Sequence, residues 1–221
     1  MPVGVVTLNV WALPEPLAKD VNARMDAIAA ALPEIGADVV AFQEVWTRSA
    51  AMRLIDGAAR SGFVVLGDPA RRGGGLLLLS RLPARWQGFT PYAARGRPER
   101  FVEGDYWGHK GYARMELETE AGLVSVVTTH LQASYHPTGM DPNRFHRLAQ
   151  AVELAMAVRG LATPVVLLGD LNLREGDLAY RILRGLPDLR DSGVQPGPRA
   201  ATVLADNPYN GAGHEPTERI D

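Results

Sequence analysis

Several short apolar segments of this chain end in a polar side chain, and this pattern restricts the fold more than any other feature. Runs of β-branched and other apolar residues predict buried strands at residues 3–10, 38–42, 123–129 and 164–168. Side chains at the ends of neighbouring strands can converge on one crevice, so we expect a single site at that edge. The polar residues at these strand ends are Asn9, Glu44, His130, and Asp170 with Asn172.

Helical patterns alternate with the predicted strands. Apolar spacing predicts helices over residues 25–32, 145–158 and 177–186. A further buried strand is expected at residues 75–79, between glycine and proline turns. The two runs that flank Ala121 and Gly122 predict a β-hairpin, which brings antiparallel pairing into the sheet. We therefore expect an α/β layered fold with mixed sheets rather than a purely parallel one.

Length and composition favour one domain. The 221 residues are 46% hydrophobic, which is enough for one substantial core, so we expect a single domain over residues 1–221. The segment 191–216, rich in Gly, Pro and Asn, predicts a long ordered loop. The sequence shows neither a signal-peptide pattern nor an apolar run long enough to span a membrane. We expect a cytoplasmic protein without a transmembrane segment, and peripheral contact with a membrane stays open.

Charge and cysteine content exclude some classes of site. The 23 basic and 25 acidic residues give a net charge of −2, so the chain lacks the positive field that drives non-specific binding to nucleic acid. A polynucleotide substrate is therefore disfavoured. The sequence contains no cysteine, which rules out disulfides, thiolate metal ligands and a cysteine nucleophile within it.

Each polar strand-end residue also has a plain structural explanation. Asp170 and Asn172 can cap a helix or shape a turn, and Glu44 and His130 can do the same. Their repetition at successive strand ends favours a shared site. Carboxylate and amide oxygens suit a hard cation, so we expect Mg²⁺, with Mn²⁺ as a substitute, and Glu44 as its first ligand. Histidine and amide donors near the metal would stabilise the charge that grows on a phosphodiester.

Five sequence blocks, in order along the chain, resemble the endonuclease/exonuclease/phosphatase superfamily. They are LNVWALP (8–14), FQEVW (42–46), TTHLQASY (128–135), LLGDLNL (167–173) and ERID (218–221). The first block, HLQASY, GDYWGHKG (104–111) and HRLAQAVELA (146–155) are most similar to neutral sphingomyelinases. The resemblance implies a DNase I-like, four-layered α/β/β/α sandwich of two packed mixed sheets, with the site at one edge.

The same resemblance implies roles for individual residues. It assigns Mg²⁺ binding to Glu44 with Asn9 beside it, phosphate contact to His130 and Asn172, and orientation of the attacking water to Asp170. The resemblance to neutral sphingomyelinases further implies that two charged residues, five positions apart, pair with each other and gate substrate access. These are Asp105 and Lys110, for which ordinary surface charge is the alternative. Tyr135 is a candidate for substrate contact, with a packing role as the alternative.

The superfamily pattern continues past ERID with a further strand and a Ser-Asp-His segment, whose histidine is the general base. The aspartate that matches Asp221 orients this histidine by a hydrogen bond. The sequence at hand stops at Asp221, so two interpretations remain: a longer protein that carries the segment, or a truncated and largely inactive relative. We favour the longer protein, because loss of a core strand would leave a sheet edge uncovered.

Three functions are consistent with these features. The leading hypothesis is Mg²⁺-dependent, phospholipase C-type hydrolysis of sphingomyelin, or of a related choline or glycerol phosphodiester, by metal-assisted attack of water. A Mg²⁺-dependent nuclease would use the same chemistry with different substrate loops, but the net charge counts against it. A catalytically inactive lipid- or protein-binding module is the third, and it applies if residue 221 is the true terminus.

Overall fold

The computed structural model describes residues 2–68, 73–96, 108–134, 141–193, 201–202, 207 and 209. The chain divides into two compact units. Unit 1 comprises residues 1–91, 108–130 and 161–170, and unit 2 comprises residues 92–107, 131–160 and 171–221. The predicted site residues Asp105, Tyr135 and Asp221 lie outside the described residues, as does most of the predicted loop at 191–216. A single catalytic domain over the whole chain stays a prediction.

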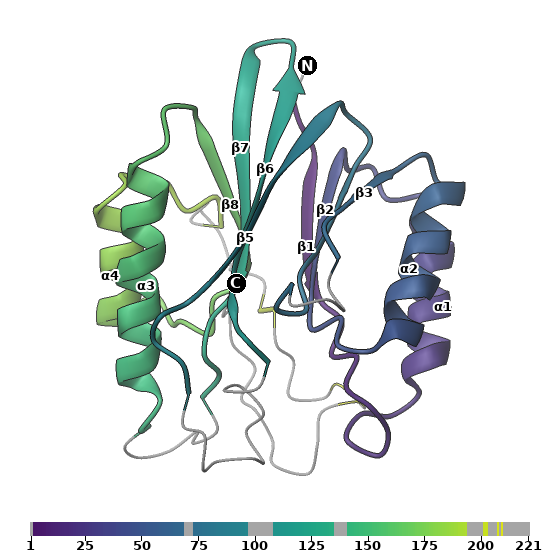
Figure 1. Cartoon of the computed structure of the whole chain (residues 1–221), viewed down its shortest axis with the longest axis horizontal. Helices are drawn as coiled ribbons and strands as arrows, with labels where there is room; N and C mark the ends of the chain where they lie inside the picture. The colour runs from purple at the N-terminus through teal and green to yellow at the C-terminus, as the bar shows by residue number, and fades with distance from the viewer. Residues whose placement is uncertain are drawn as a thin grey trace. The chain divides into compact units, whose positions relative to one another are not determined.

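The first sheet of unit 1 has four described strands, and two helices cover one of its faces (Figure 1). The elements are β1 (Val5–Asn9), α1 (Val21–Ala31), β2 (Val39–Gln43), α2 (Arg48–Arg60), β3 (Val64–Leu66) and β4 (Leu77–Ser80). The strand order is β1-β2-β4-β3. β1 and β2 are parallel, whereas β4 is antiparallel to both β2 and β3. The sheet is therefore mixed.

The second sheet of unit 1 also has four described strands and is also mixed. The strands are β5 (Ala84–Pro91), β6 (Gly111–Thr119), β7 (Gly122–His130) and β8 (Val165–Asp170). They follow each other in that order across the sheet. β5, β6 and β7 form an antiparallel meander, and β8 joins β7 in parallel. The hairpin predicted around Ala121 and Gly122 is the β6–β7 pair.

The two sheets pack face to face, and the alternation along β2 shows how. Val40 and Phe42 pack with the helices α1 and α2, whereas Val39 and Ala41 pack with β6 and β7 of the other sheet. All five residues of β2 are buried, as expected for a strand covered on both faces. Truncating such a residue, for example Phe42→Ala, would cost about 3–5 kcal/mol. The predicted α/β fold of two packed mixed sheets is thus confirmed.

Polar side chains fix the ends of the helices in unit 1. The Thr47 hydroxyl accepts a hydrogen bond from the backbone N–H of Ala50 and so caps the start of α2. The Arg81 guanidinium donates to the carbonyls of Leu32 and Ile35 just beyond α1. These bonds satisfy carbonyls that no longer have a partner within the helix.

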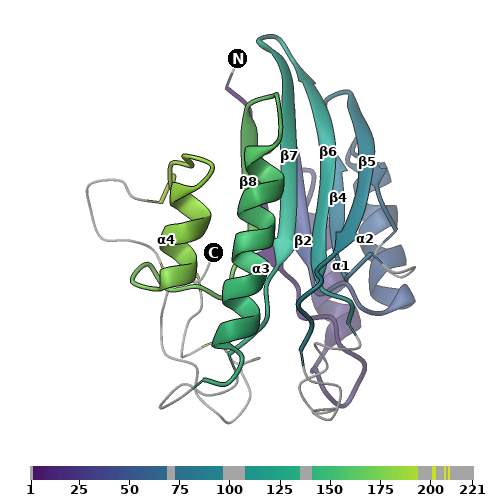
Figure 2. The ribbon, with the colours of Figure 1, turned by 60° about the vertical axis from the view of Figure 1, so that its left-hand side comes forward.

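Unit 2 contains two described helices that run side by side (Figure 2). They are α3 (Arg144–Arg159) and α4 (Leu178–Gly185). Buried polar side chains of α3 bind nearby backbone: Arg147 donates to the carbonyl of Gln132, and Gln150 accepts from the Gln132 N–H and donates to the Ala94 carbonyl. The segment that follows β7 is thereby held against α3.

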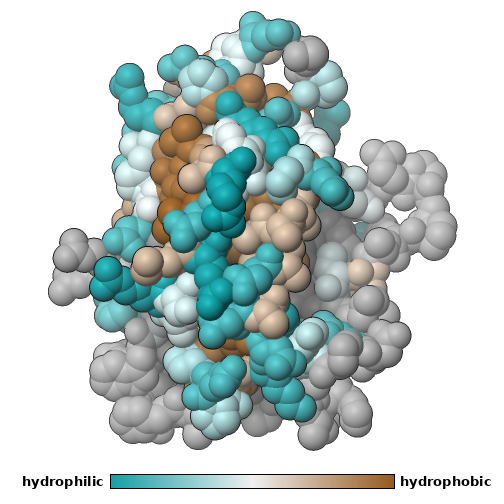
Figure 3. Space-filling view, turned by 90° about the vertical axis from the view of Figure 1, so that its right-hand side faces the viewer, coloured by the Kyte–Doolittle hydropathy of each residue, from teal (hydrophilic) through white to brown (hydrophobic). Residues whose placement is uncertain are grey.

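The outer surface of unit 1 carries mixed side chains. On the face formed by α1 and α2, hydrophilic residues run between smaller apolar patches (Figure 3). Among the helices of the described residues, none combines the length and the apolar character that crossing a bilayer requires.

Candidate active site

Four of the predicted site residues lie at the same end of the two packed sheets in unit 1. Asn9 ends β1 and Glu44 follows β2, and these two strands are neighbours. His130 ends β7 and Asp170 ends β8, and the two are register partners in the parallel ladder. Each sheet therefore contributes two polar side chains to one cluster, as the strand-end pattern predicts.

Special backbone geometry places both carboxylates. Glu44 has a φ of +59°, which turns the chain out of β2 in a region that residues other than glycine seldom occupy. The Glu44 carbonyl accepts a hydrogen bond from Ala12 at 3.0 Å, which holds this turn. Before Asp170, Gly169 has a φ of +140°, and an added Cβ would lie 2.0 Å from the Thr129 carbonyl oxygen. Only glycine lets β8 approach β7 so closely there.

Asn9 draws the two carboxylates together. Its Nδ2 donates to Glu44 Oε1 and to Asp170 Oδ2, both at 2.8 Å. Its Oδ1 accepts from the Trp11 backbone N–H at 2.9 Å. The backbone N–H of Trp11 can only donate, and ionised carboxylates can only accept. These three bonds therefore fix which atom of the Asn9 amide is oxygen and which is nitrogen. Asn9 as a metal ligand stays a prediction; in this geometry it positions Glu44 and Asp170.

Trp46 holds the second oxygen of Glu44. Its Nε1 donates to Glu44 Oε2 at 3.3 Å. The Trp46 ring packs against Gly75, where an added Cβ would lie 2.9 Å from a ring carbon. Both oxygens of Glu44 therefore have a protein donor, and the carboxylate has a defined orientation. Trp46 lies in the FQEVW block, but the sequence pattern alone gave it no role.

Substituting Trp46 tests this orientation. Trp46→Phe keeps an aromatic ring against Gly75 and removes the donor to Glu44, so we expect Mg²⁺ affinity to fall on the order of ten-fold with little loss of stability. Isothermal titration calorimetry would measure the affinity. Trp86→Phe, in β5, is the matched control, because Trp86 packs in the core between the sheets instead. Equal affinity in Trp46→Phe and the wild type would contradict the role of Trp46.

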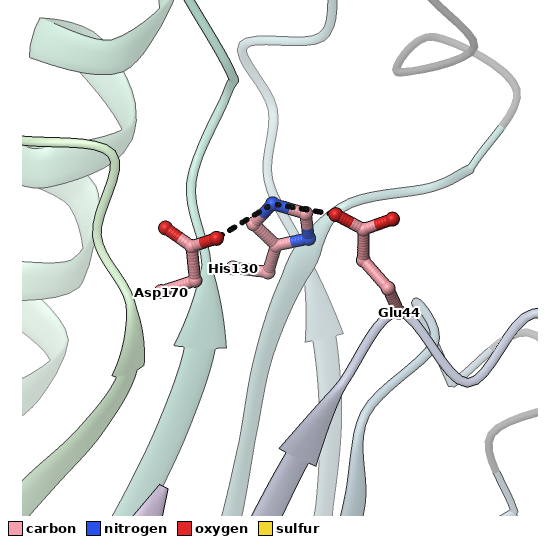
Figure 4. Close-up of side chains that lie close together, drawn as sticks. All are labelled: Glu44, His130 and Asp170. Atoms are coloured by element: carbon pink, nitrogen blue, oxygen red, sulfur yellow. Dashed lines mark ion pairs between the residues drawn. The ribbon is translucent and has the colours of Figure 1, made fainter. Parts of the chain in front are cut away.

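His130 lies between the two carboxylates: its Nε2 is 3.8 Å from Glu44 Oε1 and 3.7 Å from Asp170 Oδ2 (Figure 4). The same Nε2 is 3.0 Å from Lys110 Nζ. Burial lowers the pKa of His130 well below its usual value, and the neighbouring Lys110 charge lowers it further. His130 is therefore neutral at pH 7. Because an ammonium can only donate, Nε2 is the acceptor and the ring proton is on Nδ1.

The cluster has the donor chemistry of a site for a divalent cation. One ligand atom each from Glu44, His130 and Asp170 lies within 4.8 Å of the others. Two of these are carboxylate oxygens, and Mg²⁺ in proteins usually takes one or two carboxylates and fills its other positions with water or phosphate. His130 Nε2 already accepts from Lys110. The fit to a hard cation therefore depends mainly on the two carboxylates.

Lys110 is positioned by the start of β6. The side chain is buried, with 4% of its surface exposed, so the alternative of ordinary surface charge is wrong for this residue. The next residue, Gly111, has no room for a side chain, since a Cβ would lie 2.2 Å from the Thr90 carbonyl oxygen. Its carbonyl accepts from the Thr129 hydroxyl at 2.9 Å. The pairing of Lys110 with Asp105 falls outside the described residues.

Asn172 belongs to unit 2. It has a φ of +49°, and its Nδ2 donates to the Leu131 carbonyl at 3.1 Å. This bond anchors Asn172 to the residue that directly follows His130 in the chain. Its predicted contact with phosphate stays a prediction.

Comparisons with known proteins agree with this fold. The model of the endonuclease/exonuclease/phosphatase family matches residues 6–221. Sphingomyelin phosphodiesterase 2 of Rattus norvegicus is 30% identical over 203 residues, which cover 86% of this chain and 46% of the rat protein. The inositol phosphosphingolipids phospholipase C of Schizosaccharomyces pombe is 28% identical over 187 residues, covering 81% of this chain and 43% of the yeast protein. The chain thus spans less than half the length of these two relatives.

A solved structure shows the same fold. Beta toxin from Staphylococcus aureus, crystallised as a mutant with bound magnesium ions, superposes with a TM-score of 0.69 at 20% identity. The match covers 86% of this chain and 72% of the toxin. The packed mixed sheets are therefore DNase I-like, and the family match covers almost every residue. By sequence and by fold, this chain belongs to the endonuclease/exonuclease/phosphatase family.

Proposed function

We propose that this chain forms the catalytic part of a Mg²⁺-dependent phosphodiesterase that cleaves phosphosphingolipids in the manner of a phospholipase C. The observation that carries the proposal is the convergence of Glu44, His130 and Asp170 from both sheets, with ligand atoms within 4.8 Å of one another. The rat and fission yeast relatives support the substrate class, because their names describe action on sphingomyelin and on inositol phosphosphingolipids.

The charge of the cluster supports the requirement for a metal. Glu44 and Asp170 carry two negative charges, Lys110 carries one positive charge, and His130 is neutral at pH 7 because its pKa is lowered. The excess negative charge would repel a phosphodiester anion. A bound divalent cation reverses the sign of the cluster, so the site attracts the substrate only when the metal is present. Magnesium ions in the beta toxin structure support Mg²⁺ as that cation.

Each side chain then has a defined task. Glu44 would hold the metal, in an orientation set by Asn9 and Trp46, and the Asp170 carboxylate lies within reach of the same ion. When bound there, Mg²⁺ supplies Lewis-acid stabilisation of the charge on the phosphoryl oxygens. Asp170 accepts a hydrogen bond from the attacking water and orients it toward phosphorus. Lys110 adds positive charge and N–H donors close to the reacting phosphate, and His130 Nε2, which accepts from Lys110, helps to place that ammonium. Direct contact of His130 with phosphate stays a prediction. The products would be a ceramide and the phosphorylated head-group.

A substrate panel tests this proposal. With the full-length protein in mixed micelles, we expect Mg²⁺-dependent release of phosphocholine from sphingomyelin or of inositol phosphate from inositol phosphoceramide, and the preferred lipid identifies the head-group. EDTA should stop the reaction and added Mg²⁺ should restore it. Nicking of plasmid DNA at a higher rate than lipid hydrolysis would favour a nuclease instead. A folded full-length protein that hydrolyses neither substrate would be a binding module.

Lys110 distinguishes a catalytic role from a gating role. Its Nζ is 3.0 Å from His130 Nε2, so we expect Lys110→Met to slow hydrolysis of sphingomyelin and of a small soluble phosphodiester by the same factor, roughly 10²-fold. A gate with Asp105 would instead affect the bulky lipid more than the soluble substrate. Lys19→Met is the matched control, because Lys19 is the other lysine of the sequence and is exposed. A loss confined to the lipid would favour the gate.

A further inference from the structure

A layer of polar side chains lies between the two sheets, directly inside the cluster of Glu44, His130 and Asp170. It consists of Thr7 on β1, Gln43 on β2 and Thr128 on β7. Gln43 is 1% exposed and Thr128 is fully buried, whereas Thr7 is half-buried. Thr7 precedes Asn9 by two residues, Gln43 directly precedes Glu44, and Thr128 precedes His130 by two residues. Each member is therefore one or two positions before a polar residue at or just after the end of its strand.

One of the hydrogen bonds of Gln43 crosses between the two sheets, and its others lie within the first sheet. Gln43 Nε2 donates to Thr7 Oγ1 at 3.0 Å, within the first sheet. It also lies 3.3 Å from Thr128 Oγ1, which belongs to the second sheet. The Gln43 amide oxygen accepts from the Thr7 hydroxyl at 3.3 Å, and Nε2 further contacts the carbonyl of Ala41 at 3.1 Å. The amide thus uses both its donor and its acceptor inside the protein.

The polar character of this layer is not needed for stability. One step further into the core, the space between the sheets is filled by apolar residues such as Ala41, Met115 and Val126. Apolar residues of similar shape at all three polar positions would cost little stability, because no polar group would then be left unpaired. Apolar contact has no preferred direction, whereas a hydrogen bond favours a particular distance and angle between its two groups.

We propose that Thr7, Gln43 and Thr128 form a positioning layer that sets the offset between the two sheets. Through the strands, this offset fixes the separation of Glu44, on the first sheet, from His130 and Asp170, on the second. The inference rests on the proposed function only in that the cluster binds a divalent cation. A small slide of one sheet would move the two carboxylates apart, and such displacements reduce both metal affinity and turnover.

Removing the amide tests the layer. Gln43→Met keeps the length of the side chain and loses its hydrogen bonds. We expect the Mg²⁺ affinity measured by calorimetry to fall on the order of ten-fold and kcat to fall by up to about 10²-fold, with a smaller change in KM. Thr128→Val, which keeps shape but loses the hydroxyl, should have a smaller effect in the same direction. Thr128→Ser should restore near wild-type affinity, because it keeps the hydroxyl.

Val126→Ala is the control for a purely structural effect. Val126 lies on the same face of β7, two residues before Thr128, and belongs to the apolar core. Its truncation should lower Tm but leave the Mg²⁺ affinity unchanged. If Gln43→Met does not fold, the comparison of Thr128→Val with Thr128→Ser carries the test.

Two results would overturn the inference. One is wild-type Mg²⁺ affinity in Gln43→Met and Thr128→Val. The other is a loss of Mg²⁺ affinity that is proportional to the loss of Tm, with the same proportion in Val126→Ala as in these two variants. In both cases the wild type still binds Mg²⁺, so the proposed function stands. A wild-type protein that binds no Mg²⁺ would overturn the proposed function and this inference together.

Discussion

We expect Glu44→Gln to abolish the proposed Mg²⁺-dependent hydrolysis and to lower Mg²⁺ affinity by at least about 100-fold, while the protein stays folded. The amide keeps the volume of the carboxylate but loses its charge, which is what a hard cation needs. It also disturbs local bonding. Asn9 and Trp46 each donate to one oxygen of Glu44, and glutamine offers only one oxygen, so one donor would face an NH₂ group. At this partly buried position the lost hydrogen bond costs about 1 kcal/mol.

Turnover and calorimetric titration of Mg²⁺ would check the effect, together with a thermal melt. Glu116→Gln is the matched control, because the Glu116 carboxylate accepts from Gln87 at the surface of the second sheet. It should behave as the wild type. Activity of Glu44→Gln at ordinary Mg²⁺ concentrations would show that the metal is held elsewhere.

We expect Asp170→Asn to lower kcat by roughly 10²–10⁴-fold, with a much smaller change in KM. Asp170 is 5% exposed, and its Oδ2 accepts from Asn9 at 2.8 Å, a bond that the amide oxygen of asparagine can also make. The side chain therefore keeps its position and loses its charge. A neutral group is a poorer acceptor for the attacking water and stabilises less of the charge that develops, so the deficit appears in the chemical step.

Steady-state kinetics on sphingomyelin would separate kcat from KM. Asp26→Asn provides the comparison, since Asp26 forms an exposed ion pair with Arg53 and such pairs contribute little. An effect of Asp170→Asn on KM alone would make Asp170 a binding residue and would remove it from the reaction itself.

The sequence predicts the location of the cluster because its members lie at the ends of short apolar strands. Strand period is a local property, and polar residues at the ends of neighbouring strands converge on one edge, as His130 and Asp170 do as register partners. The same reasoning brings Asn9 next to the end of β2, which Glu44 follows. The structure adds the distances and hydrogen bonds that show these side chains meeting.

Other parts of the fold and site depend on contacts that no local pattern contains. The burial of Lys110 follows from the close packing of Gly111 against Thr90 and from the bond of Gly111 to Thr129, which join three different strands. The role of Gln43 depends on the packing of two sheets. The strand β5 was not predicted, because Gly88 and a register shift interrupt its alternation.

The helix α2 was also not predicted, although its start carries a recognisable signal. The Thr47 hydroxyl accepts a hydrogen bond from the backbone N–H of Ala50, three residues later, and threonine in this position is typical of a helix N-cap. The buried side of the helix is formed mostly by small residues, including Ala50, Ala51 and Ala58. Together with Leu54 they recur at helical spacing, so the amphipathic pattern is present in the sequence, and combined with the Thr47 cap it would have identified the helix.

Anomalous diffraction from crystals of the full-length protein soaked in Mn²⁺ tests the central claim most directly, because it locates the metal without relying on a substrate. We expect one strong peak at coordination distance from the Glu44 carboxylate, within the cluster that includes Asp170, and no such peak in Glu44→Gln crystals. A strong peak away from this cluster, or occupancy that persists unchanged in Glu44→Gln, would contradict the metal-dependent site described here.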